Sequence, residues 1–202
     1  AIQSGPISDA ARKLIETELA AQDNTTGYES ALKTERVYGI AMIRSGNVGP
    51  AKITRYMPRF LLNEGCTLDL YDTVIPTAAR PWYQVSKELD AIKAEMTRTH
   101  VYSSRAVAQM LIPALQATRS AADRTQAKVR CLRVLVALQA LLEQQPGATP
   151  SLDKLNVPPE ATIDPFTGQP LILKQTDGGW LIYSVGENLT DDGGSVGDNK
   201  DV

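Results

Sequence analysis

The chain ends in a segment rich in aspartate, asparagine and glycine, "ENLTDDGGSVGDNKDV", whose side-chain oxygens could bind a cation. The candidate donors are Asn188, Asp191, Asp192, Asp198 and Asp201. Calcium takes about six to eight oxygen ligands, and a glycine-rich loop lets backbone carbonyls turn toward the ion. The ligand spacing of an EF-hand is absent. From the residues alone, the segment is either a metal-binding loop or a solvated acidic end.

The other reactive side chains give little support for catalysis. His100 is the only histidine, which excludes a site built from several histidines. Cys66 and Cys131 form no CxxC pair and are compatible with one disulfide or with two buried thiols. Cys131 lies in an apolar segment, where thiols are usually inert, and could act with His100 only if the fold brought the two together. No nucleotide-binding, zinc-protease or serine-hydrolase motif occurs, and we expect no enzymatic activity.

The composition favours helices and gives a low expectation of nucleic-acid binding. The chain has 202 residues, 43% of them hydrophobic and 5% aromatic, which suits packed helices around a core better than a β-sandwich. The net charge of -2 provides no general attraction to nucleic acid or to an anionic membrane. No apolar run is long enough to span a bilayer, and the start, "AIQSGPISDA", lacks the parts of a signal peptide. We therefore expect any membrane attachment to depend on an anchor outside this chain.

The first part of the chain predicts a series of helices. Ser8 is a suitable N-cap for a helix through about residue 21, and a second helix from Tyr28 should end at "SGNVGP". Pro58 should split the next segment, "PAKITRYMPRFLL", into two short pieces. Around Cys66 and Pro76 the pattern predicts no regular element.

The helical pattern sharpens in the following segment. A stripe with helical spacing from Val85 to Met96 predicts a helix that ends near residue 99. At its start, Trp82 and Tyr83 are expected to close the core rather than to bind a partner. A further helix begins near residue 107, bends at Pro113 and can continue directly into the next one.

The last part of the sequence changes from helix to strands. Residues 121 to 144 predict a very apolar helix with a basic amino-terminal half that we expect to face solvent. The basic side chains of that half are Arg124, Lys128, Arg130 and Arg133. After a proline-rich loop, "LILKQT" and "WLIYSV" flank "DGG", which predicts an antiparallel hairpin packed on this helix.

The motifs of residues 121 to 202 occur in a characteristic order. A long helix and a proline-rich loop precede the turn "DPFTGQP", in which Asp164 should accept backbone hydrogen bonds. The hairpin with "GGW" then leads to the step formed by Ser184, Val185 and Gly186, and to the Gly/Asp-rich end. This order resembles the globular part of the major pseudopilin of bacterial type II secretion systems, which has a DPW-G-x-P-like turn, an "SLG"-like step and a calcium-binding loop.

The resemblance implies a structural calcium ion in the acidic end. The implied ligands are Asp198 and Asp192 first, Asn188 and Asp191 next, with backbone carbonyls near Val185 and Leu189. In one respect the chain departs from the family, because about 120 residues that predict helices precede the helix that in pseudopilins carries the membrane-inserted amino terminus. The chain therefore looks more like an anchored bacterial protein that carries a pseudopilin-like carboxy-terminal module.

These patterns together predict an α+β protein with a helical region at residues 1–120 and a pseudopilin-like module at residues 121–202. By resemblance, we expect a non-catalytic, extracytoplasmic structural or assembly protein whose partners are proteins of an envelope or secretion system. The alternative is an envelope binding module whose helical region holds a peptide, lipid or carbohydrate. A deep apolar pocket between helices would favour binding, and a flat surface would favour assembly.

Overall fold

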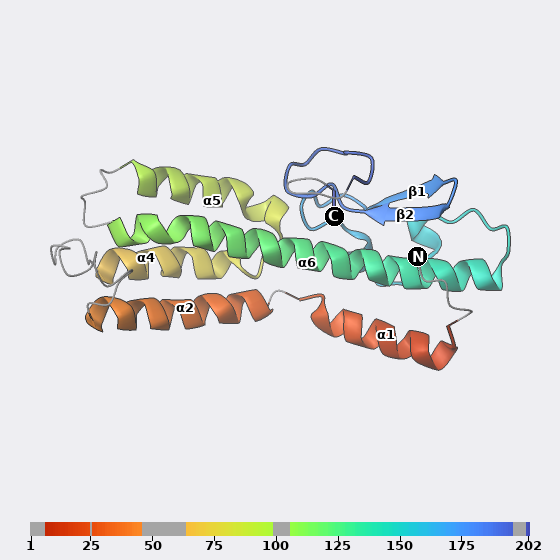
Figure 1. The fold of residues 1–202 in the computed structure, drawn as a ribbon, viewed down its shortest axis with the longest axis horizontal. Coiled ribbons are helices and arrows are strands. Elements are labelled where there is room, and N and C mark those ends of the chain that lie inside the picture. The colour runs from red at the N-terminus through yellow and green to blue at the C-terminus, as the bar shows by residue number, and fades with distance from the viewer. Residues whose placement is uncertain (1–6, 25, 46–63, 99–105, 196–200) are drawn as a thin grey trace. The chain divides into compact units, whose positions relative to one another are not determined.

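The computed structural model describes residues 7–24, 26–45, 64–98, 106–195 and 201–202, and these residues are mostly helical (Figure 1). The helices are α1 (Asp9–Gln22), α2 (Thr26–Ser45), α4 (Glu64–Val74), α5 (Trp82–Thr97) and α6 (Ala106–Gln144). The strands β1 (Ile172–Thr176) and β2 (Gly179–Tyr183) form one antiparallel sheet. The predicted α+β class is confirmed. No helix in the described ranges is both long and apolar enough to cross a bilayer.

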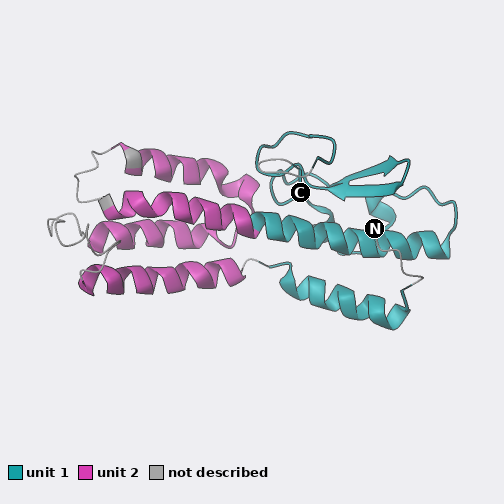
Figure 2. Cartoon of the chain, viewed as in Figure 1, with its two compact units in different colours: residues 1–24, 123–202 teal, residues 25–122 magenta. Residues whose placement is uncertain are grey.

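The chain divides into two compact units (Figure 2). Unit 1 combines residues 1–24 with residues 123–202, and unit 2 contains residues 25–122. The division at residue 122 lies close to the boundary expected from the sequence, but the first 24 residues belong with the carboxy-terminal part. Helix α6 contributes residues to both units.

Unit 2 is a helical unit whose core lies among α2, α4 and the first part of α6. Leu32, Leu70, Tyr71 and Ile112 are among its buried side chains. No regular element was expected around Cys66 and Pro76, and this prediction is wrong because Cys66 lies in α4 and Pro76 in the short 3-10 helix η2 (Ile75–Thr77). The segment "PAKITRYMPRFLL" lies outside the described residues.

The missed helix α4 buries residues with helical spacing, although polar residues interrupt the pattern. Thr67, Leu70, Tyr71 and Val74 are buried on one face, at intervals of three or four residues. A buried threonine in this stripe makes the apolar face difficult to recognise from sequence. Pro76 is compatible with the fold because it lies at the start of η2, where its missing N–H is not required.

Helix α5 and the long helix α6 follow the predicted pattern closely. Val85 is fully buried in α5. Trp82 is partly buried, whereas Tyr83 is 43% exposed, so the expectation that both rings close the core fails for Tyr83. The helix predicted from residue 107 continues through Pro113 to Gln144 as one helix of 39 residues.

Unit 1 packs a hairpin and its loops on the second part of α6. Strands β1 and β2 pair from Ile172 with Tyr183 to Thr176 with Gly179, which confirms the hairpin around "DGG". The core contains Val134 and Leu138 of α6 together with Leu155 and Leu171. The short 3-10 helices η3 (Leu152–Lys154) and η4 (Pro159–Thr162) lie in the connection between α6 and β1. Helix α1 begins at the predicted cap, where the Ser8 side chain accepts a hydrogen bond from the Ala11 amide.

Candidate functional site

Asp164 joins the "DPFTGQP" turn to the "SVG" step. Its side chain is buried, and its Oδ1 accepts hydrogen bonds from the Phe166 amide at 2.8 Å and the Ser184 hydroxyl at 2.9 Å. Its Oδ2 accepts from the Val185 amide at 3.1 Å. The predicted role of Asp164 in fixing the turn is confirmed, and the same carboxylate also holds the end of β2.

The described residues of the acidic end are folded onto unit 1. Ser184 and Val202 exchange backbone hydrogen bonds of 2.8 and 2.9 Å. Asp201 is 1% exposed, and its two oxygens accept from the Asp192 amide at 3.2 Å and the Gly194 amide at 2.6 Å. The last two residues are therefore structural parts of the unit rather than a solvated extension.

Four of the six predicted ligand positions lie in the loop that Asp201 closes, and a fifth lies at its entrance. The Asn188 amide donates to Asp192 at 2.9 Å, and Leu189 has a positive φ of 57°, an unusual conformation for leucine. Asp191 accepts from the Tyr183 hydroxyl and the Gly193 amide, both at 2.9 Å. The entrance position, Val185, is held by Asp164, and Asp198 lies outside the described residues.

Electrostatic effects link this loop to β2. The hydrogen bonds from the Gly193 amide and the Tyr183 hydroxyl lower the pKa of Asp191, and the charge of Lys174 adds to the effect. Burial, followed by the hydrogen bond to Asp191 and the charges of Asp191 and Asp201, raises the pKa of Tyr183 to about 12. Tyr183 is therefore protonated at neutral pH and can donate to the carboxylate.

The oxygen donors of the loop fit calcium chemically, because they are carboxylates, an amide and backbone carbonyls. Asp201 adds a structural argument, since among the described residues this buried carboxylate accepts from two backbone amides and forms no ion pair. A cation nearby would offset the cost of burying its charge. Within the described ranges no three acidic, histidine or cysteine side chains are placed to hold a metal ion. A complete ligand set would therefore need Asp198.

A buried ionic cluster connects α1 to α6 in unit 1. The side chain of Asp23 is 3% exposed and accepts from Arg130 at 3.0 Å and from Arg133 at 2.8 Å. Arg133 also contacts Glu16 at 2.7 Å, and Arg130 donates to the Ile163 carbonyl at 2.7 Å. The expectation that the basic half of this helix faces solvent is wrong for both arginines, because their acidic partners come from α1 and its end.

A catalytic pair of Cys131 and His100 is not seen among the described residues. Cys66 and Cys131 are both free thiols. Burial, followed by the charge of Asp164, raises the pKa of Cys131 to about 12 against a weaker opposing hydrogen bond from Ser184. Cys131 is therefore protonated at neutral pH and unsuited to act as a nucleophile. His100 lies outside the described residues.

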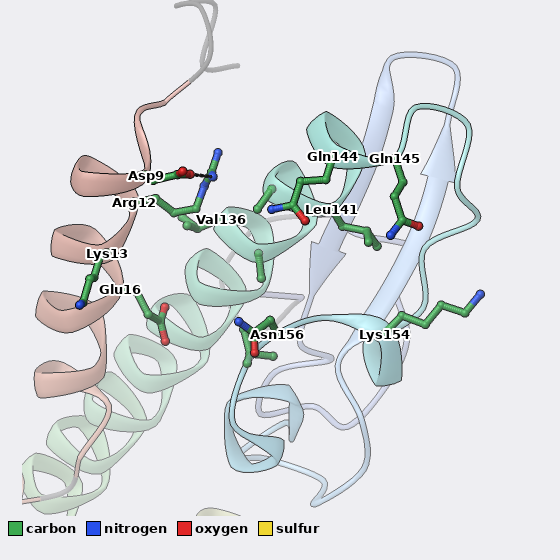
Figure 3. A pocket seen from close by; sticks show the side chains of 13 residues that line it. Asp9, Arg12, Lys13, Glu16, Val136, Leu141, Gln144, Gln145, Lys154 and Asn156 are labelled. Carbon is green, nitrogen blue, oxygen red and sulfur yellow. Dashed lines mark hydrogen bonds and ion pairs between the residues drawn. The ribbon is translucent and has the colours of Figure 1, made fainter.

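A groove that the sequence did not predict lies in unit 1 along α1, α6 and the segment before residue 158 (Figure 3). We call it the α1–α6 groove. Its volume is about 510 Å³, within the range of ligand sites. Val136, Ala140, Leu141 and Val157 are among its apolar lining residues. In contrast, a cavity of unit 2 beside Trp82 has only about 30 Å³.

The chain matches no protein-family model, no curated protein and no solved structure.

Proposed function

We propose that this chain is a non-catalytic structural or assembly protein of an extracytoplasmic system related to type II secretion or pilus-like assemblies. In this proposal, unit 1 contains the pseudopilin-like module, and a calcium ion stabilises its carboxy-terminal loop. An anchor outside this chain would attach the protein to the membrane, and its partners would be envelope or secretion proteins.

The observation that carries the proposal is the closure of the acidic loop by Asp201. A buried carboxylate without a cationic partner among the described residues lies next to a loop containing Asn188, Asp191 and Asp192. An ion held by these side chains and Asp198 would balance the charge that the fold buries. The contacts of Asp164 also support the pseudopilin-like reading, because they join its two motif segments in one hydrogen-bonded unit.

Calcium would act structurally, by binding the folded loop and not the unfolded chain. At a free calcium concentration about a hundredfold above the dissociation constant, such binding stabilises a fold by roughly 2.7 kcal/mol. For a chain of this size, the melting temperature would rise by about 5–10 °C. The side chains that hold the ion would perform no reaction step.

The test is thermal unfolding of chelator-treated protein with and without calcium, with magnesium as the comparison ion. We expect a calcium-specific rise that Asp192→Asn removes. Asp177→Asn is the matched control, because Asp177 is an exposed aspartate in the hairpin turn outside the loop. Equal effects of calcium and magnesium, or no shift at millimolar calcium, would contradict the calcium-bound module.

A further inference from the structure

We propose that the α1–α6 groove is the docking site for an extended acidic peptide segment of a partner protein. This inference rests on the proposed assembly function, since it names the kind of partner such a protein would hold. The groove is distinct from the acidic loop, because its lining comes from α1, the end of α6 and residues 154–157.

The floor that α6 contributes to the groove is apolar and includes small residues. Ala137 and Ala140 line the groove together with the larger side chains of Val136 and Leu141, and Ala137 and Leu141 also pack against the core of unit 1. All four are only partly buried, although each carries an apolar side chain. Small residues in such a floor let a chain lie close to the helix, and the larger ones provide contacts for alternate side chains.

Primary amides around the groove favour a peptide over a lipid chain. Gln144, Gln145 and Asn156 line it, and all three are exposed (Figure 3). A side-chain amide both donates and accepts hydrogen bonds, which matches the alternating N–H and C=O groups of an extended backbone. An alkyl chain offers these amides no hydrogen-bonding groups.

The charges that remain available in the groove are positive. Arg12 is paired with Asp9 at 2.9 Å and with Glu143 at 2.6 Å. Glu16 is paired with Arg133, so both acidic residues of the lining, Asp9 and Glu16, have a basic partner. Lys13 and Lys154 line the groove and form no ion pair with the described part of the chain. Charge complementarity therefore selects a segment with carboxylates.

The first measurement uses the isotope-labelled chain and the synthetic peptide acetyl-EVSPEVSPEV-amide. We expect saturable binding below about 1 mM, with changes in the amide NMR signals of Ala137, Ala140 and Val157. The counterpart acetyl-QVSPQVSPQV-amide, which has the same length and no carboxylates, should bind at least about tenfold more weakly.

The second measurement changes the protein. The double variant Lys13→Glu and Lys154→Glu should weaken binding of the acidic peptide by at least about tenfold. Lys87→Glu with Lys128→Glu is the matched control, since both lysines are exposed and lie outside the groove. This control should stay within about twofold of the unchanged chain. Thermal unfolding of each variant identifies any loss of fold.

Three outcomes would overturn the proposal. They are equal binding of the two peptides, signal changes outside the groove, and binding of decanoate in the groove without binding of the acidic peptide. Each outcome is independent of the calcium test, which uses Asp192 and no groove residue. Loss of peptide binding with a preserved calcium shift would reject the docking site alone, whereas the reverse result would reject the calcium-bound module alone.

Discussion

The replacement of Asp23 by alanine should destabilise unit 1 more than any surface ion-pair change in this chain. The Asp23 carboxylate accepts from Gln126 at 3.1 Å, Arg130 at 3.0 Å and Arg133 at 2.8 Å. The side chains of Arg130 and Arg133 are 13% and 5% exposed, so water would replace the lost carboxylate poorly. Removing one partner of a buried ion pair typically costs about 3–5 kcal/mol.

The remaining contacts reduce this cost to the lower end of the range. After the change, Arg133 keeps Glu16 and Arg130 keeps the Ile163 carbonyl. Helix α1 also has no buried residue, so it can separate locally and let water reach both guanidinium groups. We therefore expect a loss of about 3 kcal/mol, which corresponds to a fall in melting temperature of roughly 6–12 °C.

Urea and thermal unfolding followed by circular dichroism measure this loss, and amide hydrogen exchange locates it. Exchange should accelerate first in α1, because the cluster attaches the end of this helix to α6. Asp23→Asn, which keeps the side-chain volume, separates the loss of charge from the loss of packing. The matched control is Asp9→Ala, since Asp9 is 97% exposed and its partner Arg12 keeps Glu143.

The control should cost less than about 1 kcal/mol, as is usual for exposed ion pairs. Equal small effects of Asp23→Ala and Asp9→Ala would contradict a stabilising role of the buried cluster. A fall in the unfolding free energy without faster exchange in α1 would show that the cluster does not attach that helix.

The tail and the partly buried thiol of Cys131 allow two further predictions. Gly194→Ala should cost about 2–3 kcal/mol, because Gly194 has a φ of +86° and an added Cβ would overlap the Leu181 side chain of β2. Gly193 has a similar φ of +74°, but an added Cβ there would meet no atom within 4 Å, so Gly193→Ala should cost only about 1 kcal/mol. Both costs are measured by denaturant unfolding. Equal costs would show that the tail does not contact the hairpin. In a Cys66→Ser background, Cys131 should react with iodoacetamide at pH 8 about a thousandfold more slowly in the folded chain than in urea, because its pKa is raised from 9.0 to about 12. Fast labelling of the folded protein at pH 8 would contradict the raised pKa of this thiol. The raised pKa also makes a contribution to the stability of the folded chain that is fully present below pH 9 and is lost as the pH rises toward 12.

Elements that depend on nearby residues could be predicted from the sequence. The hairpin follows from "DGG" between two apolar segments, and the cap at Ser8 follows from its position before a helical pattern. Asp164 could also be assigned, because its main partner Phe166 is two residues away. Such signals are local, so a single segment contains both the donor and the acceptor.

Features that depend on distant pairing could not be predicted in the same way. Arg130 and Arg133 have the composition of a solvated basic face, and only the fold brings Asp23 to them from 107 and 110 positions away in sequence. The α1–α6 groove is also formed by distant segments, so neither Lys13 nor Lys154 carries a signal of its own. The burial of Asp201 depends on the return of the chain end to Ser184, which no pattern in the tail indicates.

That return has a consequence for the proposed calcium ion. Val202 pairs with Ser184, and Ser184 in turn donates to Asp164, so the loop is attached at its entrance and at its end. Closing a loop has an entropic cost that increases with its length. Because these contacts already close it, an ion would order only the residues between them and not the whole tail. Removal of Asp201 and Val202 should therefore weaken calcium binding even though Asn188, Asp191 and Asp192 remain.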